Sequence, residues 1–136
     1  MDSKEIANRR LTLDDLAHYD EAAEVEFWYA REIQGFLGYK EWRNFETAID
    51  RAVASINTTK RPGEHHFVMV NKMVDLGSGS KRKIKDYKLT RYACYLIAMN
   101  GDPRKEEIAF AQSYFALQTR KQELIEEHML AISRIA

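Results

Sequence analysis

The amino-acid sequence predicts a small α+β domain that is rich in helix, with a short sheet or β-hairpin and a long C-terminal helix. Three observations predict this class. A nearly all-apolar segment covers residues 91–99, a β-branched and aromatic segment covers 25–29, and a Gly/Ser turn at 77–80 separates two stretches with strand character. Strands and helices mixed in this way along one short chain are typical of α+β domains.

The apolar segment at 91–99 is the predicted centre of the fold. Thr90 is a good N-cap, because its hydroxyl can accept a hydrogen bond from the first turn of a helix. A helix that is apolar on all sides is expected to be buried on all sides. Asn-Gly at 100–101 predicts a left-handed stop. Asp102 is then expected to cap a second helix, with Pro103 in its first turn.

A long helix is predicted from Arg104 to Ala136, since no Gly or Pro interrupts this stretch. At about 1.5 Å rise per residue it would span roughly 50 Å, which is more than a small domain can cover. We therefore expect residues 128–136 to be a truncated or oligomerising end. Residues with a heptad-like spacing, which predict a partner or homodimer surface, are Tyr114, Leu117, Leu124, His128 and Ala131.

The first 23 residues are predicted to form a polar, acidic segment with one short helix. Residues 1–10 are expected to be loose. Thr-Leu-Asp-Asp at 12–15 resembles a capping box that would open a helix running to His18. The segment from Val25 to Tyr29 predicts a strand, because it combines β-branched and aromatic residues.

Two helices are predicted after this strand. Residues 30–37 would form a short one that ends at Gly38, and residues 41–56 an amphipathic one with Trp42 and Phe45 at its start. The pair could form a helix-turn-helix or could simply close over a core. The second reading is favoured, because short helices often meet at a glycine. Residues 57–64 are expected to form a loop.

A β-hairpin is predicted between residues 67 and 89. Its first half, 67–76, is compatible with strand or short helix, while 81–89 is expected to return as a strand. Basic residues are dense here, and the candidate nucleic-acid contacts are Lys81, Arg82, Lys83, Lys85, Lys88 and Arg91. They could bind a phosphate backbone, or they could only keep an exposed hairpin soluble, and both readings remain open.

Composition and motifs favour a cytoplasmic protein without catalytic activity. The formal charge is zero, and no signal region or membrane-spanning run is present. Cys94 cannot form a disulfide framework, and its apolar neighbours predict an inert thiol. His65 and His66 would point to opposite faces of a strand, so neither a metal ion nor any other cofactor is expected. The Gly-rich turn at 77–80 lacks the spacing of a nucleotide-binding loop.

Several blocks of the sequence resemble the DNA-damage-inducible protein D family. They include Tyr-Ala-Arg-Glu-Ile-Gln-Gly-Phe-Leu-Gly-Tyr-Lys-Glu-Trp-Arg-Asn-Phe at 29–45 and Leu-Thr-Arg-Tyr-Ala-Cys-Tyr-Leu-Ile-Ala-Met-Asn-Gly-Asp-Pro-Arg at 89–104. The blocks at 66–79 and 112–124 continue the resemblance, which covers roughly residues 24–127. The strand, the Ala-Arg helix and the Leu-Gly-Tyr turn are also similar, more distantly, to the N-terminal module of BRO and phage antirepressor proteins. DNA binding is the usual assignment for that module.

The resemblance implies a bacterial or phage protein of the DNA-damage (SOS) response. It implies an action on recombination through RecA filaments on single-stranded DNA, without catalysis, and it implies that this chain is the N-terminal part of a longer protein. We therefore expect a non-enzymatic regulator that binds DNA, with single-stranded DNA favoured over double-stranded, or a RecA–DNA filament. The alternative is an antirepressor-like module that binds a transcriptional repressor or self-associates. A hydrolase or nuclease is disfavoured, because the sequence lacks any metal-carboxylate constellation.

Overall fold

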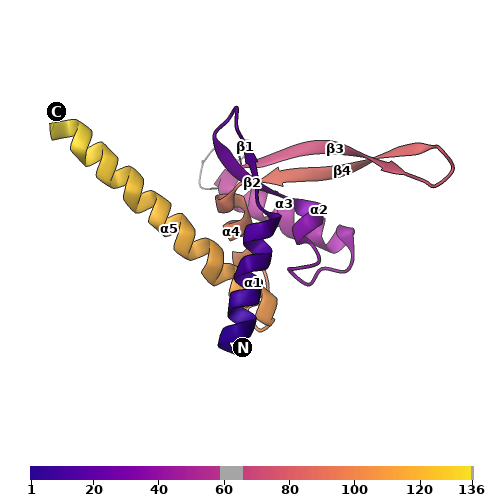
Figure 1. Cartoon of the computed structure of the whole chain (residues 1–136), viewed down its shortest axis with the longest axis horizontal. Helices are drawn as coiled ribbons and strands as arrows, with labels where there is room; N and C mark the ends of the chain where they lie inside the picture. The colour runs from indigo at the N-terminus through magenta and orange to yellow at the C-terminus, as the bar shows by residue number, and fades with distance from the viewer. Residues whose placement is uncertain (59–65, 136) are drawn as a thin grey trace.

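An antiparallel sheet with helices packed around its base forms the body of the molecule (Figure 1). The computed structural model describes residues 1–58 and 66–135, and in the last helix it describes side chains to Ala116, at His128 and at 131–134. The elements are, in order, α1 (Ser3–Leu16), β1 (His18–Asp20), β2 (Val25–Tyr29), α2 (Ala30–Ile33), α3 (Trp42–Thr58), β3 (Phe67–Asp75), β4 (Lys81–Leu89), α4 (Arg91–Met99) and α5 (Glu106–Ile135).

The sheet has the strand order β1-β2-β4-β3, and its strands differ greatly in length. β3 and β4 pair along nine residues each, from Phe67 opposite Leu89 to Asp75 opposite Lys81. β2 pairs only with the end of β4 next to α4, where Trp28 lies opposite Leu89. The far half of the β3–β4 hairpin consequently projects from the body as a two-stranded arm (Figure 1).

The core lies around α4, as the sequence predicts. Cys94 and Ile97 are fully buried, and Trp28 meets Phe115 edge to face with 5.4 Å between ring centroids. The indole Nε1 of Trp28 donates a 2.9 Å hydrogen bond to the carbonyl of Leu13, which attaches α1 to the sheet. Burial raises the pKa of the Cys94 thiol, so this side chain behaves as a small apolar residue.

Most predicted elements are confirmed, and so is the α+β class. Thr90 caps α4 by accepting a hydrogen bond from the amide of Ala93 at 3.2 Å. β2 has the predicted bounds, and α3 begins and ends within two residues of the predicted ones. The ambiguous first half of the hairpin is a strand. α2 is shorter than expected, but Ala30, Ile33 and Leu37 share the buried face as predicted.

The prediction for the N-terminus is wrong. Residues 3–16 form one helix, α1, which Asp2 caps by accepting a 2.8 Å hydrogen bond from the amide of Glu5. Thr12 is therefore inside the helix, where its hydroxyl donates to the carbonyl of Asn8 at 2.9 Å, and it does not open a second helix. The strand β1 was not expected, because three residues carry too little pattern to be recognised.

The turn between α4 and α5 also differs from its prediction. Gly101 is absent from the described residues with positive φ, so no left-handed stop occurs there. A glycine is needed for a different reason, since a Cβ at this position would lie 2.9 Å from Cγ2 of Ile108. α5 begins at Glu106 rather than after Asp102, whose carboxylate accepts from the amide of Arg104 instead. α4 is not buried on all sides either, because Met99 is half exposed.

The long C-terminal helix is confirmed as a backbone element. α5 extends over 30 residues and projects from the body on the side opposite to the hairpin arm (Figure 1). Across the residues that the structure describes, none of the helices combines the length and apolarity that a membrane crossing requires. Most of the loop predicted at 57–64, together with His65, lies outside the described residues.

Candidate nucleic-acid interface

The tip of the arm is built by a turn with two left-handed glycines. Gly77 and Gly79 have φ values of +83° and +79°, which other residues adopt only with strain. The amide of Leu76 donates a 2.9 Å hydrogen bond to the carbonyl of Ser80 and closes the turn. All residues from 75 to 83 are exposed, so any charge placed here is in contact with solvent.

Basic residues of β4 alternate between the two faces of the arm. Because successive side chains of a strand point to opposite faces, Lys81, Lys83 and Lys85 share one face, while Arg82 and Lys88 share the other. In the neighbouring strand, Lys72 lies opposite Ile84 and so belongs to the second face. The basic run of the sequence therefore does not form a single patch.

Three basic residues at the tip carry charge that no neighbour neutralises. Lys81, Arg82 and Lys83 are exposed, and none of the carboxylates whose side chains the structure describes forms an ion pair with them. Asp75 is the residue across from Lys81 in the ladder, but their charged groups form no ion pair either. These cations are available to an anion from solution.

Lys85 lies closer to the base of the arm, and its side chain contacts α3 in the body of the molecule. Its Nζ lies 3.0 Å from Oε2 of Glu46 on α3 and 5.3 Å from the ring of Tyr87. The hydrogen bonds to Tyr87 and Glu46 raise the pKa of Lys85 above its ordinary value. Lys88 is likewise directed inward, with Nζ 4.9 Å from the ring centroid of Phe27.

Asp86 anchors the base of the arm from within the sheet. Its side chain is fully buried, and Oδ1 accepts hydrogen bonds from the amides of Arg31 at 3.0 Å and Tyr87 at 2.8 Å. Oδ2 lies 3.0 Å from Nζ of Lys72, which also lies 4.2 Å from the ring centroid of Tyr29. This carboxylate therefore ties α2, β3 and β4 together, and the sequence alone did not reveal it.

Arg91 is placed in the core rather than on the arm. Its Nε donates to Oε1 of Glu26 at 2.5 Å, and its guanidinium lies 5.0 Å from the ring centroid of Trp28. Burial lowers the pKa of Arg91, but the hydrogen bond and charge of Glu26 outweigh this, and the pKa is raised. The structure thus separates Arg91 from the tip residues with which it was grouped.

The predicted partner residues of α5 fall into three groups. Tyr114 is buried, and its hydroxyl forms a short hydrogen bond to Oδ1 of Asp14 on α1. His128 and Ala131 are exposed on the projecting part of the helix. The side chains of Leu117 and Leu124 lie outside the described residues. A role of these α5 residues in a homodimer stays a prediction.

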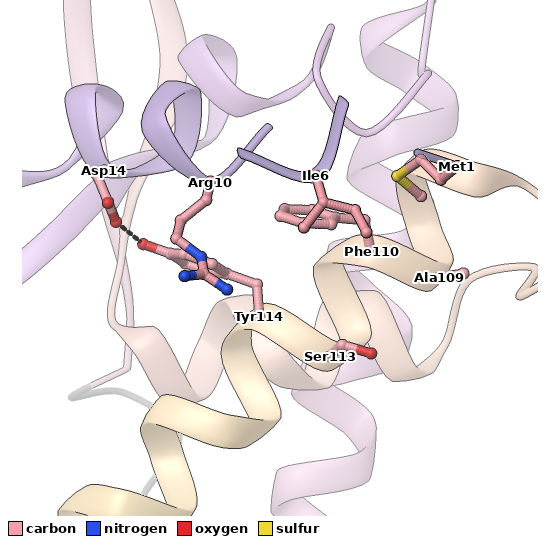
Figure 2. Close-up of a pocket in the computed structure, with 8 residues that line it drawn as sticks. All are labelled: Met1, Ile6, Arg10, Asp14, Ala109, Phe110, Ser113 and Tyr114. Carbon is pink, nitrogen blue, oxygen red and sulfur yellow. Dashed lines mark hydrogen bonds between the residues drawn. The ribbon is translucent and has the colours of Figure 1, made fainter. Parts of the chain in front are cut away.

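A groove of about 460 Å³ lies between α1 and the first turns of α5 (Figure 2). Its apolar side is lined by Met1, Ile6 and Phe110, and the side chain of Arg10 extends toward Tyr114. Burial, followed by the hydrogen bond to Asp14, raises the pKa of Tyr114 at the floor of this groove to about 12. The tyrosine is therefore neutral at ordinary pH, and its hydroxyl is held by the Asp14 carboxylate.

No metal-binding group is assembled by the part of the chain that the structure describes. Nowhere in it do three or more His, Cys, Asp or Glu side chains come close enough to hold one ion. Nδ1 of His66 lies 2.7 Å from the Thr90 hydroxyl, and Nε2 of His18 lies 2.6 Å from Oε1 of Glu32. His66 and His18 are thus engaged in local contacts.

Comparison with known protein families identifies one that matches most of the chain. Residues 16–116, from the end of α1 to Ala116 in α5, match the N-terminal domain of the BRO family. The chain belongs to the BRO family. The BRO domain contains the whole sheet, including the hairpin arm, and the buried helix α4.

The BRO domain also has a curated relative with high similarity. The chain is 45% identical over 103 residues to DNA damage-inducible protein D of Escherichia coli (strain K12). The alignment covers 76% of this chain and 38% of that protein, so the chain spans well under half the length of this relative. No solved structure shows a significant match.

Proposed function

We propose that this chain is a non-enzymatic regulator of the DNA-damage response, and that it acts by placing the tip of the hairpin arm on a DNA backbone. The membership in the BRO family and the similarity to DNA damage-inducible protein D support the cellular setting. The proposed ligand is single-stranded DNA, either bare or in a RecA filament. The proposed effect is a modulation of recombination.

One observation carries the binding mode: the unneutralised cations of the arm are gathered at its exposed tip. Lys81, Arg82 and Lys83 project from a two-stranded ribbon that stands clear of the helices (Figure 1). The acidic residues of the N-terminal region, which would repel phosphate, belong to the body and not to the arm. Net neutrality of the chain is therefore compatible with a local positive field at the tip.

The inner basic residues have a different role in this proposal. Lys85 and Lys88 fix the arm to α3 and β2 through Glu46 and Phe27. Arg91 holds Glu26 beside the core. These contacts set the direction of the arm, and the tip supplies the phosphate contacts. We expect affinity to be weak at physiological salt, because only three contacts contribute.

The experiment is fluorescence anisotropy of labelled single- and double-stranded DNA with the intact chain at 50 and 200 mM salt. Three phosphate contacts predict that affinity falls roughly 20- to 40-fold between these concentrations. A RecA filament assembled on the same labelled strand serves as the second ligand. Absence of binding to every form of DNA at 50 mM salt would contradict direct DNA recognition by this chain.

A protein-binding role of antirepressor type is the second candidate. The groove between α1 and α5 favours it, because Met1 and Ile6 remain exposed at its rim beside Phe110. In this reading a repressor or another copy of the chain would contact that side of the body. The substitution Ile6→Glu distinguishes the two candidates, since it should weaken a protein complex through the groove and leave DNA affinity unchanged.

A further inference from the structure

The outer edge of β3 is an unpaired sheet edge with regularly spaced backbone groups. β3 is the last strand in the order β1-β2-β4-β3, so one of its two sides has no neighbouring strand among the described residues. The amide of Thr90 donates to the carbonyl of His66, and the amide of Leu76 donates to the carbonyl of Ser80. Even-numbered residues of β3 therefore bond to β4. Odd-numbered residues, from Phe67 to Asp75, direct their N–H and C=O groups outward.

This edge lacks the protection that sheet edges ordinarily have. Natural edge strands are kept apart by lysines, prolines, bulges or short length. β3 has nine residues in unbroken register, and its only lysine, Lys72, is bound to the buried Asp86 at 3.0 Å. Apolar side chains beside the edge are instead exposed, with 60% exposure at Met69 and 55% at Met73. The outward backbone groups and exposed apolar side chains of this edge are suited to pairing with another strand.

The sequence of β3 is self-complementary when it is read against itself in the antiparallel direction. The segment Val-Met-Val-Asn-Lys-Met-Val at 68–74 has Asn71 at its centre. Pairing about this residue sets Met69 opposite Met73 of a second copy, and Val68 opposite Val74 of that copy. We propose that two copies of this chain associate through their β3 edges in this register, with Asn71 on the two-fold axis.

The backbone pattern agrees with this register. In a pairing centred on Asn71, the partners are odd-numbered residues on both strands, which are the residues with outward N–H and C=O groups. A register centred on Lys72 also aligns outward groups, but it places two lysines directly opposite each other. Like charges in that position destabilise a sheet, so the register on Asn71 is preferred.

The assembly follows from symmetry. Two four-stranded sheets would join into one continuous sheet, and a two-fold pairing of this kind closes without further growth. The tips of the two arms would point in opposite directions, and Lys81, Arg82 and Lys83 would stay outside the interface because β4 lies on the far side of β3. The dimer therefore does not rest on the proposed DNA contact, and each can fail without the other.

Charge substitutions test both the association and its register. The mass of the intact 15.9 kDa chain is measured by sedimentation equilibrium, where the wild type is expected to approach twice the monomer mass with rising concentration. Met69→Glu/Met73→Glu places acid opposite acid in the proposed pairs and should weaken the dimer at least tenfold. Met69→Lys/Met73→Glu places opposite charges there and should restore it.

A cross-link gives an independent readout. Residues that face each other across an antiparallel hydrogen-bonded pair have Cα atoms about 5.5 Å apart, within the range that a disulfide spans. Asn71→Cys should thus form a covalent dimer under mild oxidation. Ser78→Cys, a control that is also exposed and lies at the tip, should not, since the two tips lie at opposite ends. The buried Cys94 is common to both variants.

Each outcome decides for or against the β3 interface. A monomeric wild type at all concentrations overturns the proposal. Equal cross-linking of Asn71→Cys and Ser78→Cys shows random collision and also overturns it. A dimer that both charge variants leave intact places self-association elsewhere, such as on α5. Rescue by opposite charges together with selective cross-linking at 71 supports it.

Discussion

The base and the tip of the hairpin arm share one continuous basic stretch of β4, yet the cations at the base have partners and those at the tip have none among the described side chains. At the base, Lys85 is paired with Glu46, Lys88 lies on Phe27, and Lys72 is bound to the buried Asp86. At the tip, Lys81 and its two basic neighbours are exposed without an ion pair among the described residues. Charge that is equal in the sequence is thus neutralised at one end of the arm and available at the other.

This difference shows why a basic run does not by itself define a binding surface. A cation that already has a carboxylate or a ring gains little from a phosphate, because it must give up the first contact to make the second. The base residues instead fix the arm against α2, α3 and β2. These base contacts set the direction in which the arm leaves the body.

The largest expected effect concerns the anchor at the base. Asp86→Ala should destabilise the fold by about 3 kcal/mol, because Lys72 loses its partner and the amides of Arg31 and Tyr87 lose an acceptor. Urea denaturation followed by circular dichroism measures the change. The matched control is Asp75→Ala, which removes an exposed acid from the same hairpin and should change stability by less than about 0.5 kcal/mol.

If both substitutions cost the same free energy, then burial does not distinguish the base from the tip. That result would contradict the view that buried contacts stabilise the base of the arm but not its tip.

A second expected effect lies outside the arm and tests whether burial also changes the behaviour of an ionisable side chain elsewhere in the protein. Burial and the hydrogen bond to Asp14 raise the pKa of Tyr114 from 10.0 to about 12. Because the folded-state pKa is the higher one, the stabilisation is fully present below pH 10 and is lost as the pH rises toward 12. After allowance for partial solvent screening, the loss should be about 1–2 kcal/mol.

Thermal unfolding between pH 8 and 11.5 measures this effect, and Tyr114→Phe is the control. The substituted chain should lose the part of the alkaline destabilisation that Tyr114 causes. A pH profile unchanged by the substitution would show that Tyr114 titrates as an ordinary exposed tyrosine.

The smallest expected effect concerns the pair between Lys85 and Glu46. Both side chains are partly exposed, so the coupling free energy should be only about 0.5 kcal/mol. A double-mutant cycle with Lys85→Met and Glu46→Gln isolates this value. A coupling of several kcal/mol would mean that Lys85 belongs with Asp86 as an anchor. A coupling of zero would mean that Lys85 resembles the tip residues.

Elements with a strong local pattern could be predicted from the sequence. Thr90, the apolar run after it and the glycine turn at 77–80 fixed the positions of α4 and the hairpin, because capping and turn preferences depend on near neighbours. The helix α1 could not be recognised in the same way. Leu13 is the one residue of this helix that is buried, so the segment shows no periodic apolar face.

The contacts at the site that the sequence could not reveal join residues that are distant in the sequence. Asp86 looked like a lone acid in a basic run, and only the register that sets β3 beside β4 brings Lys72 to it. Arg91 was grouped with the lysines of β4 because it follows them closely in sequence. Its partner Glu26 lies 65 residues earlier, on a strand that reaches it only in the folded sheet.

In the proposed binding mode, the tip of the arm binds phosphate and the base does not. This binding mode is tested most directly by the salt dependence of DNA affinity for two variants, Lys81→Ala/Arg82→Ala/Lys83→Ala and Lys85→Ala/Lys88→Ala. The first should lower the slope of log K against log salt by about 2–3 without a change in stability of more than about 0.5 kcal/mol. The second should keep the slope of the wild type. An unchanged slope for the tip variant, or an equal loss for the base variant, would contradict the account.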